Sequence, residues 1–287
     1  MITLPQSQWT TLTPDQAEAF DRDGFLVVRE ALDPDRVAAC IEAGDRLVAS
    51  DRQEGRRDAG RSDGFRNVIA LDPVFRELLC HPRTVPLVIQ LMGPNLQLHT
   101  SDLIWKYPDA SGEEDKRTPG WHRDIAAVTR DLDHDRMPRL EIKVAYYLTD
   151  CLSPTDGQTR VAAGSHRWRT TWQRQPGDLD PAECVVPEMR AGDALLFENR
   201  TWHAGGPNQS GRIRKTLMMG YSHYWIRPDD YDHQKPEVLD QCDPRERCLI
   251  AQQNRNFDEL GRFRPCTVET ALEIWAKENG WTAPACH

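Results

Sequence analysis

A histidine and an aspartate two residues apart form the first pattern in this sequence that could do chemistry. His122 and Asp124 stand in the segment Gly120-Trp-His-Arg-Asp. In an extended strand, side chains at positions i and i+2 project from the same face, so the imidazole and the carboxylate would point together. These groups can supply two ligands of a facial triad, in which two histidines and one carboxylate bind iron(II) and leave three adjacent positions open. The alternative is an ordinary histidine–aspartate hydrogen bond at a strand edge.

The third metal ligand is predicted at His203, which follows an apolar strand and precedes the turn-rich segment 204–208. Eleven residues later, Arg214 begins another apolar strand. A guanidinium group binds both oxygens of a carboxylate, so Arg214 is a candidate partner for the distal carboxylate of a dicarboxylate cosubstrate. Taken singly, His203 could be a structural histidine and Arg214 a surface charge. Their conjunction with the H-x-D pattern carries the prediction of an iron centre.

Such a site needs a rigid frame, and the hydrophobic pattern predicts one made of strands. Period-two segments separated by turn signals are expected at 96–107, 140–148, 159–162, 194–197 and 215–225. Before them, helices are expected after the N-caps Thr13 and Asp33 and within 73–92, with a short strand over 25–28. A last helix is expected over 269–277.

Helices on either side of antiparallel strands predict an α+β, mainly β fold built on a sandwich or barrel. The prediction is one domain over residues 1–287, with a helical N-terminal layer over 1–95, a strand core over 96–226 and a C-terminal extension over 227–287. A separate domain after Pro228 is the alternative, but no linker composition supports it.

Composition narrows the class of partner. The formal net charge of −9 argues against nucleic acid and against anionic membrane surfaces, which both attract a surplus of lysine and arginine. No apolar run reaches membrane-spanning length, and the first residues lack the basic and apolar regions of a signal peptide. The eight cysteines are scattered without a C-x-x-C pair, so a cytoplasmic protein with reduced thiols is expected. The partner is therefore expected to be a small molecule; nothing indicates the oligomeric state.

The spacing of the candidate ligands resembles that of a known family. H-x-D, then a distal histidine followed eleven residues later by arginine, resembles the phytanoyl-CoA dioxygenase family of iron(II)/2-oxoglutarate enzymes, which includes ectoine hydroxylases. Residues 20–28, 156–157 and 243–249 are also similar to family segments, as is the Gly-Ser-His at 164–166. Ala163 stands where the family usually has a proline, a departure that leaves the ligands untouched.

This resemblance implies a double-stranded β-helix, or jelly roll, that holds iron(II) between His122, Asp124 and His203. It further implies that Arg214 binds 2-oxoglutarate, which O2 converts to succinate and CO2 while a substrate C–H bond is hydroxylated. Lys106 resembles a lysine that precedes the metal motif in many members and could help to hold the cosubstrate. A halogenase is disfavoured, because it requires the carboxylate ligand to be missing and Asp124 is present.

The strand over 141–148 predicts further site residues. One apolar set of side chains should share a face and pack against the helices: Ile142, Val144, Tyr146 and Leu148. The opposite set should face into the barrel: Glu141, Lys143, Ala145 and Tyr147. A lysine directed into a barrel is costly unless it meets an anion, so Lys143 and Tyr147 are predicted to line the pocket, with Lys143 on a carboxylate of substrate or cosubstrate. Trp121 is predicted to line it as well. The alternative is an edge strand with a solvated Lys143.

The substrate is expected to be a small polar metabolite or a natural-product intermediate. A CoA thioester would favour a basic groove, and no Gly-rich phosphate loop is visible in the sequence. The alternative from another class is a metal-binding, cupin-like isomerase or binding protein without redox activity; Arg214 at its matching distance favours the dioxygenase. His134, between Asp133 and Asp135, is expected in a solvated loop rather than at the metal.

Overall fold

The computed structural model describes residues 9–54, 62–110, 120–125, 128, 137–175, 177–251, 262 and 269–282. Its first two helices begin at the predicted caps. In α1 (Pro14–Asp23), the Thr13 side chain accepts the amide of Gln16, and the Gln16 side chain accepts the amide of Thr13. The helix ends at Gly24, whose φ of 81° lies in the left-handed region. In α2 (Pro34–Gln53), the side chain of Asp33 accepts the amide of Arg36.

Antiparallel strands form two sheets in the described part of the chain. The main sheet has six strands in the order β1-β7-β4-β9-β3-β2, and the smaller sheet has three in the order β6-β5-β8. The main-sheet strands are Phe25–Val28 (β1), Ser62–Arg66 (β2), Leu96–Lys106 (β3), Glu141–Tyr147 (β4), Ala194–Glu198 (β7) and Arg214–His223 (β9). The smaller sheet contains Thr159–Ala162 (β5), Cys184–Val185 (β6) and His203–Gly205 (β8).

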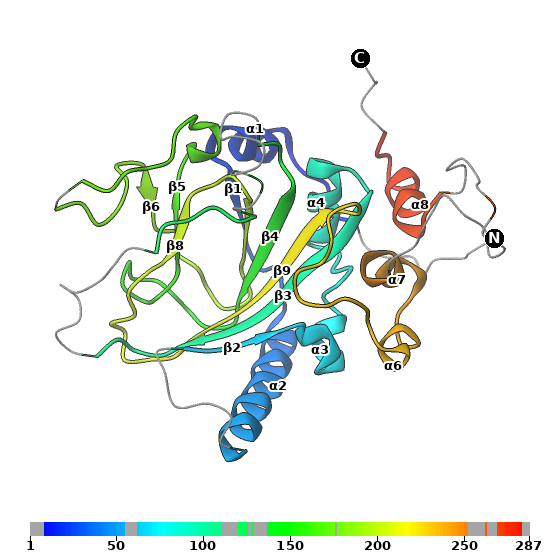
Figure 1. Cartoon of the computed structure of the whole chain (residues 1–287), viewed down its shortest axis with the longest axis horizontal. Coiled ribbons are helices and arrows are strands. Elements are labelled where there is room, and N and C mark those ends of the chain that lie inside the picture. The colour runs from blue at the N-terminus through cyan, green and yellow to red at the C-terminus, as the bar shows by residue number, and fades with distance from the viewer. Residues whose placement is uncertain are drawn as a thin grey trace.

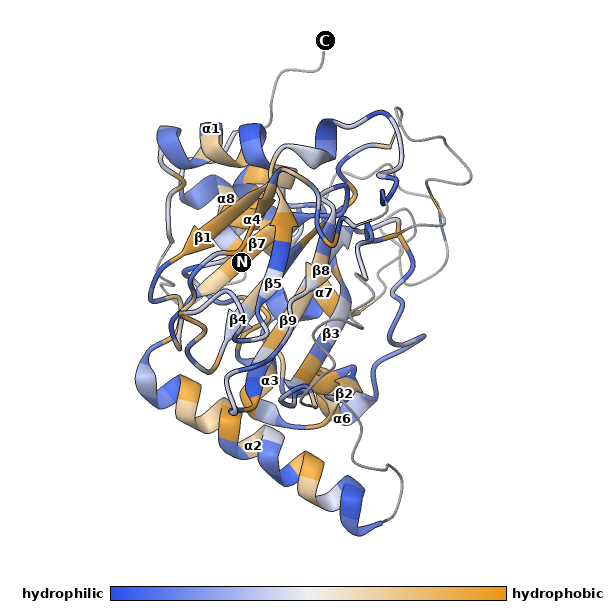
Figure 2. Cartoon of the chain, turned by 90° about the vertical axis from the view of Figure 1, so that its left-hand side faces the viewer, coloured by the Kyte–Doolittle hydropathy of each residue, from blue (hydrophilic) through white to orange (hydrophobic). Residues whose placement is uncertain are grey.

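The remaining helices gather on the side of the main sheet that faces away from the smaller sheet, as Figure 1 shows. They are α3 (Pro73–Arg76), α4 (Val85–Met92), α6 (Pro236–Leu239), α7 (Pro244–Ile250) and α8 (Ala271–Glu278). Short 3-10 turns occur at Val68–Ala70 and, after β5 of the smaller sheet, at Ser165–Arg167. Figure 2 shows that α2 alternates hydrophobic and hydrophilic residues along its length, as a helix covering one surface requires. None of the helices in these ranges is long and apolar enough to cross a membrane.

The two faces of the main sheet separate as the alternation of β4 predicts. On the face toward the helices, here called the outer face, Ile142, Val144 and Tyr146 join one large apolar core. The Tyr146 hydroxyl is hydrogen bonded to Thr84 Oγ1 at 2.6 Å. On the opposite, inner face, Ala145 and Tyr147 belong to a second cluster between the two sheets. The predicted division of this strand is confirmed.

The antiparallel two-sheet architecture with flanking helices confirms the predicted fold class, but three details differ. β2 was not predicted, because its sequence Ser-Asp-Gly-Phe-Arg has no apolar alternation; it lies at the sheet edge beside β3. The segment 1–95 therefore supplies β2 to the main sheet in addition to the predicted strand β1 and the helices. The H-x-D segment is not a continuous strand; within it, His122 alone forms an isolated bridge.

Candidate metal centre

The three predicted metal ligands lie together. One ligand atom from each of His122, Asp124 and His203 lies within 4.8 Å of the other two. His122 Nε2 is 3.9 Å from Asp124 Oδ1, and His203 Nε2 is 3.7 Å from Asp124 Oδ2. Two imidazole nitrogens and one carboxylate at these separations can bind a single divalent ion from one side.

Backbone hydrogen bonds hold the two segments that carry the ligands. The amides of His122 and His203 each donate to the other residue's carbonyl at 3.0 Å. The amide of Asp124 donates to the carbonyl of Asn199 at 3.1 Å. The side-chain Oδ1 of Asn199 in turn accepts the amide of Leu140, just before β4. The ligands are thus tied to β8 and to the β7 end of the main sheet before any metal binds.

The hydrogen bonds of both imidazoles leave Nε2 available as a ligand. His122 Nδ1 lies 2.7 Å from the carbonyl of Gly120, and His203 Nδ1 lies 3.0 Å from the carbonyl of Thr201. A carbonyl can only accept, so Nδ1 carries the proton and Nε2 keeps its lone pair. Asp124 Oδ2 is buried without a hydrogen-bond partner. Two oriented imidazoles and an unsatisfied carboxylate oxygen fit a divalent metal.

Electrostatics favour the metal-binding protonation states of His203 and Asp124. Burial lowers the pKa of His203 to about 4, so its imidazole is neutral at physiological pH, as ligation requires. Burial opposes ionisation of Asp124, but the neighbouring His203 and the Lys143 ammonium outweigh it and lower the pKa of this carboxyl group. The Lys143 ammonium lies 3.4 Å from Asp124 Oδ1. Burial works against the charge of Lys143, and the Asp124 carboxylate overrides it, so the pKa of Lys143 is raised.

Arg214 lies on the inner face without a carboxylate partner among the residues that the structure describes. Its side chain is buried, its Nη1 donates to Thr216 Oγ1 at 2.6 Å, and its Nε has no hydrogen-bond partner. Burial lowers the pKa of Arg214, while the nearby Tyr147 opposes this shift. The Tyr147 hydroxyl accepts the amide of Thr159 at 2.9 Å. A buried guanidinium with spare donors can bind an anion.

The other predicted site residues are placed differently. Lys106 pairs in register with Arg214 across β3 and β9, and its ammonium donates to the carbonyl of Gly206. Trp121 packs in a separate buried cluster with Trp202, and its Nε1 donates to Asp180 Oδ1 at 3.1 Å. In this cluster Trp121 is a packing residue, and its role in the pocket stays a prediction. His134 lies outside the described residues.

Sequence reasoning missed several polar residues around the centre. Asn199, which holds both Asp124 and the start of β4, stands in an apolar strand end without a motif. Asp102 and Thr100 are buried on the inner face of β3, in register with Met218 and Gly220 of β9. Polar residues inside an otherwise apolar strand are a usable signal, because a buried carboxylate needs a partner.

Comparison with known proteins decides the family. The model of the family described as Phytanoyl-CoA dioxygenase (PhyH) matches residues 20–216. The chain belongs to the phytanoyl-CoA dioxygenase family. The dioxygenase depends on iron(II) and 2-oxoglutarate, and its H-x-D…H facial triad consists of His122, Asp124 and His203.

Similar proteins support this placement of the dioxygenase. Ectoine dioxygenase of Sphingopyxis alaskensis is 29% identical over 251 residues, covering 75% of this chain and 78% of the relative. Ectoine dioxygenase of Bordetella bronchiseptica is 25% identical over 242 residues, covering 74% and 75% of the two chains.

Solved structures match the fold. HygX from Streptomyces hygroscopicus, with nickel and 2-oxoglutarate bound, has a TM-score of 0.62 at 19% identity, covering 76% of this chain and 89% of HygX. EctD from S. alaskensis with bound Fe has a TM-score of 0.58 at 24% identity, covering 82% and 86%. These likenesses show that the dioxygenase has the antiparallel β-sandwich of double-stranded β-helix type.

Proposed function

We propose that this dioxygenase hydroxylates an unactivated C–H bond of a small polar metabolite or natural-product intermediate. When bound, iron(II) and 2-oxoglutarate supply the oxidant from O2, with release of succinate and CO2. The triad would present the metal to the space between the sheets. Residues 1–287 would act as one dioxygenase domain, since β1 and β2 complete the sheet that carries the site.

The buried guanidinium of Arg214 carries the proposal. A charge that is buried without an ionised partner costs free energy, so a ligand must supply the carboxylate. The distal carboxylate of 2-oxoglutarate would accept from Arg214, while Thr216 holds the guanidinium in place. Lys106 would act indirectly: it would fix the loop at Gly206 near this end of the cosubstrate and would not contact the cosubstrate itself.

Lys143 and Tyr147 would line the same space from β4. Lys143 is held by Asp124, so its ammonium would orient this metal ligand and face the bound substrate. Tyr147 is fully buried near Arg214 and would close the cosubstrate end against water. The aspartate in the triad argues against halogenation, because it occupies the position that a halide would need.

Anaerobic addition of iron(II) and 2-oxoglutarate tests the proposal. We expect a visible metal-to-ligand charge-transfer band. A metal-binding isomerase or binding protein without redox activity should not give this band. In this titration, Arg214→Ala should lower the apparent affinity for 2-oxoglutarate by roughly thirty- to a hundredfold. This fold-change corresponds to the loss of a charge-assisted contact of about 2–3 kcal/mol. The matched control is Arg212→Ala, whose side chain is 63% exposed. Equal affinities of Arg214→Ala and the wild type for 2-oxoglutarate would refute the role of Arg214 in binding the cosubstrate. Succinate release that no C–H substrate accelerates would refute the hydroxylase.

A further inference from the structure

A patch of charged side chains on the inner face lies next to the metal centre and away from Arg214. Lys143 is in register with Phe197 of β7, whose ring lies 4.6 Å from that of His203. On its other side, Lys143 is in register with Gly220 of β9, and Gly220 is in register with Thr100 of β3. The patch therefore starts one strand away from the metal.

Gly220 leaves room on β9 that a neighbouring carboxylate fills. A Cβ atom at this position would collide with Glu141 Oε1 and would lie 2.6 Å from Thr100 Oγ1. The Glu141 side chain consequently lies flat over Gly220, between β4 and β3. Arg214 stands six residues away on the same strand, roughly 20 Å at about 3.3 Å per residue, so the patch and the cosubstrate end are well separated.

Negative charge exceeds positive charge in this patch. The side chains of Asp102, Glu141 and Asp230 are all at most 7% exposed. Arg66 lies 3.0 Å from Asp102 and 3.2 Å from Asp230, so one guanidinium, itself 61% exposed, serves two carboxylates. Lys143, a second cation, is engaged by the metal ligand Asp124, and its charge also acts on Glu141 and Asp102. Burial lowers the pKa of His99, but its hydrogen bond to Glu141 outweighs burial and raises it, so His99 can offset one carboxylate and the patch still holds the larger number of acidic groups. An anionic surplus in a region of low dielectric attracts a cation.

Some acceptor atoms of the patch have no donor. Glu141 Oε1 lies 2.9 Å from His99 Nδ1, but Glu141 Oε2 has no hydrogen-bond partner although the residue is 1% exposed. Thr100 Oγ1 is also buried without a partner, and Asp102 Oδ1 makes no aligned hydrogen bond despite its ion pair with Arg66. A bound group that brings several N–H donors and a positive charge would complement these atoms, and a protonated amine has three such donors.

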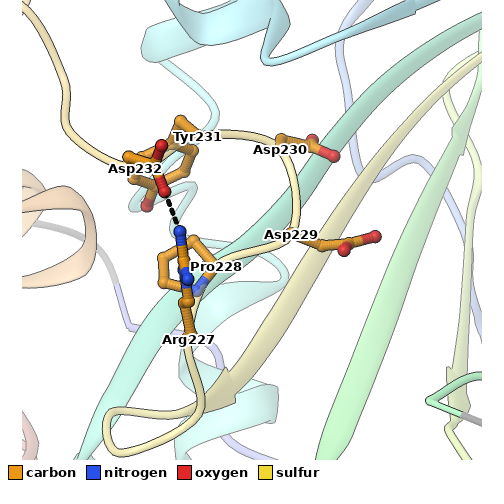
Figure 3. Close-up of a pocket in the computed structure, with 6 residues that line it drawn as sticks. All are labelled: Arg227, Pro228, Asp229, Asp230, Tyr231 and Asp232. Atoms are coloured by element: carbon orange, nitrogen blue, oxygen red, sulfur yellow. Dashed lines mark hydrogen bonds and ion pairs between the residues drawn. The ribbon is translucent and has the colours of Figure 1, made fainter. Parts of the chain in front are cut away.

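The loop after β9 continues the negative surface toward solvent. Figure 3 shows the carboxylates of Asp229 and Asp230 directed from this loop toward the strands, whereas Arg227 is paired with Asp232. Asp230 accepts the amide of Ser101 at 2.5 Å, which fixes the loop against β3. Burial raises the pKa of Asp102 to about 6, which a neighbouring cation would reverse.

We propose that the substrate carries a protonated amine, which Asp102 and Glu141 bind on the inner face of the main sheet. The proposal rests on the proposed function, because it places the amine beside the iron and away from Arg214. The carbon to be oxidised would be one within reach of the metal when the amine is held between Asp102 and Glu141. A substrate that is neutral or anionic at this end would leave Glu141 Oε2 without a partner.

Binding of amines to the enzyme loaded anaerobically with iron(II) and 2-oxoglutarate tests the proposal. The probes are putrescine, lysine and glucosamine, each beside its fully N-acetylated form, with dissociation constants measured by titration calorimetry. We expect at least one amine to bind at least about ten times more tightly than its acetylated form. Asp102→Asn and Glu141→Gln should each raise the dissociation constant of that amine by about tenfold. The matched control is Glu42→Gln, a carboxylate on α2 that is 77% exposed, and it should bind amines as the wild type does.

The charge-transfer band separates the possible failures. If the wild type forms no band with iron(II) and 2-oxoglutarate, the proposed function fails. If the band forms and the acetylated probes bind as tightly as the amines, or no amine binds, the amine proposal alone is overturned. It is equally overturned if Asp102→Asn and Glu141→Gln both retain the band and full amine affinity. Presence of the band in each variant also shows that the variant is folded and loaded.

Discussion

The outer and inner faces of the main sheet bury different kinds of side chain on the same strands. The outer face of β4 places Ile142, Val144 and Tyr146 in an apolar core shared with the helices. The inner face of the same strand carries Glu141 and Lys143, close to the metal ligands. Burial of the apolar set stabilises the fold, whereas burial of the charged set costs free energy unless every charge finds a partner.

This difference assigns stability to one face and chemistry to the other. Charged groups on the inner face are retained although apolar residues of similar size would fold as well or better. Substitutions on the two faces should therefore change different measurements. An outer-face variant should lose stability at unchanged turnover per folded molecule, and an inner-face variant should do the reverse.

The largest loss of activity is expected at the metal centre, where His203→Ala removes one of the three metal ligands. Two remaining protein ligands rarely hold iron(II), so we expect no detectable turnover and no charge-transfer band with 2-oxoglutarate. Metal content after gel filtration checks the cause. His233→Ala, at an exposed histidine, is the control and should keep both iron and activity. Full turnover by His203→Ala would show that the triad is misassigned.

The next effect belongs to the outer face. Val144 is fully buried, and Val144→Ala should reduce the free energy of unfolding by about 2–3 kcal/mol through lost burial and a residual cavity. The midpoint temperature of thermal unfolding should fall by roughly 5 °C, while turnover per folded molecule stays at the wild-type value. Val185→Ala, on β6 and 37% exposed, should change the midpoint little. A fall in turnover with unchanged stability in Val144→Ala would break the division between the faces.

The smallest of the three effects is expected for Lys143→Met, which nearly keeps the length of the side chain and deletes the charge beside Asp124. Loss of the group that orients a metal ligand typically costs at least about tenfold in metal affinity or activity. Iron titrations and steady-state kinetics measure both. Lys215→Met provides the outer-face match, because Lys215 contacts Asp45 on α2 rather than the metal ligands. Wild-type metal affinity and kinetics in Lys143→Met would remove this lysine from the site.

Local chemistry made much of this molecule predictable. The caps at Thr13 and Asp33 depend on residues three positions apart, so the sequence alone identifies the helix starts. The two faces of β4 follow from the alternation of side-chain direction along a strand, with apolar residues at 142, 144 and 146. The metal ligands were found through the spacing of H-x-D and a distal histidine, although the assumption of a continuous strand at His122 was wrong.

The inner face of β3 was not predictable in the same way. Leu96 and Leu98 face outward, and simple alternation would send Asp102 outward with them. The register with β9 shifts between Leu98 and Thr100, so Leu103 faces outward and Asp102 faces inward. No residue type around position 99 predicts this register shift. One extra residue in the strand thus decides whether a carboxylate lies at the site or beneath the helices.

The pairing of β1 with β7 constrains how a nascent chain can fold. Phe25 lies opposite Phe197, so the first strand to leave the ribosome must wait for one of the last strands of the sheet. Such distant pairing slows folding, because a long loop must close before any contact forms. Meanwhile the four residues of β1 remain exposed on the growing chain. Since β7 leads directly to His203, β1 cannot dock until the segment just before the last metal ligand has been synthesised.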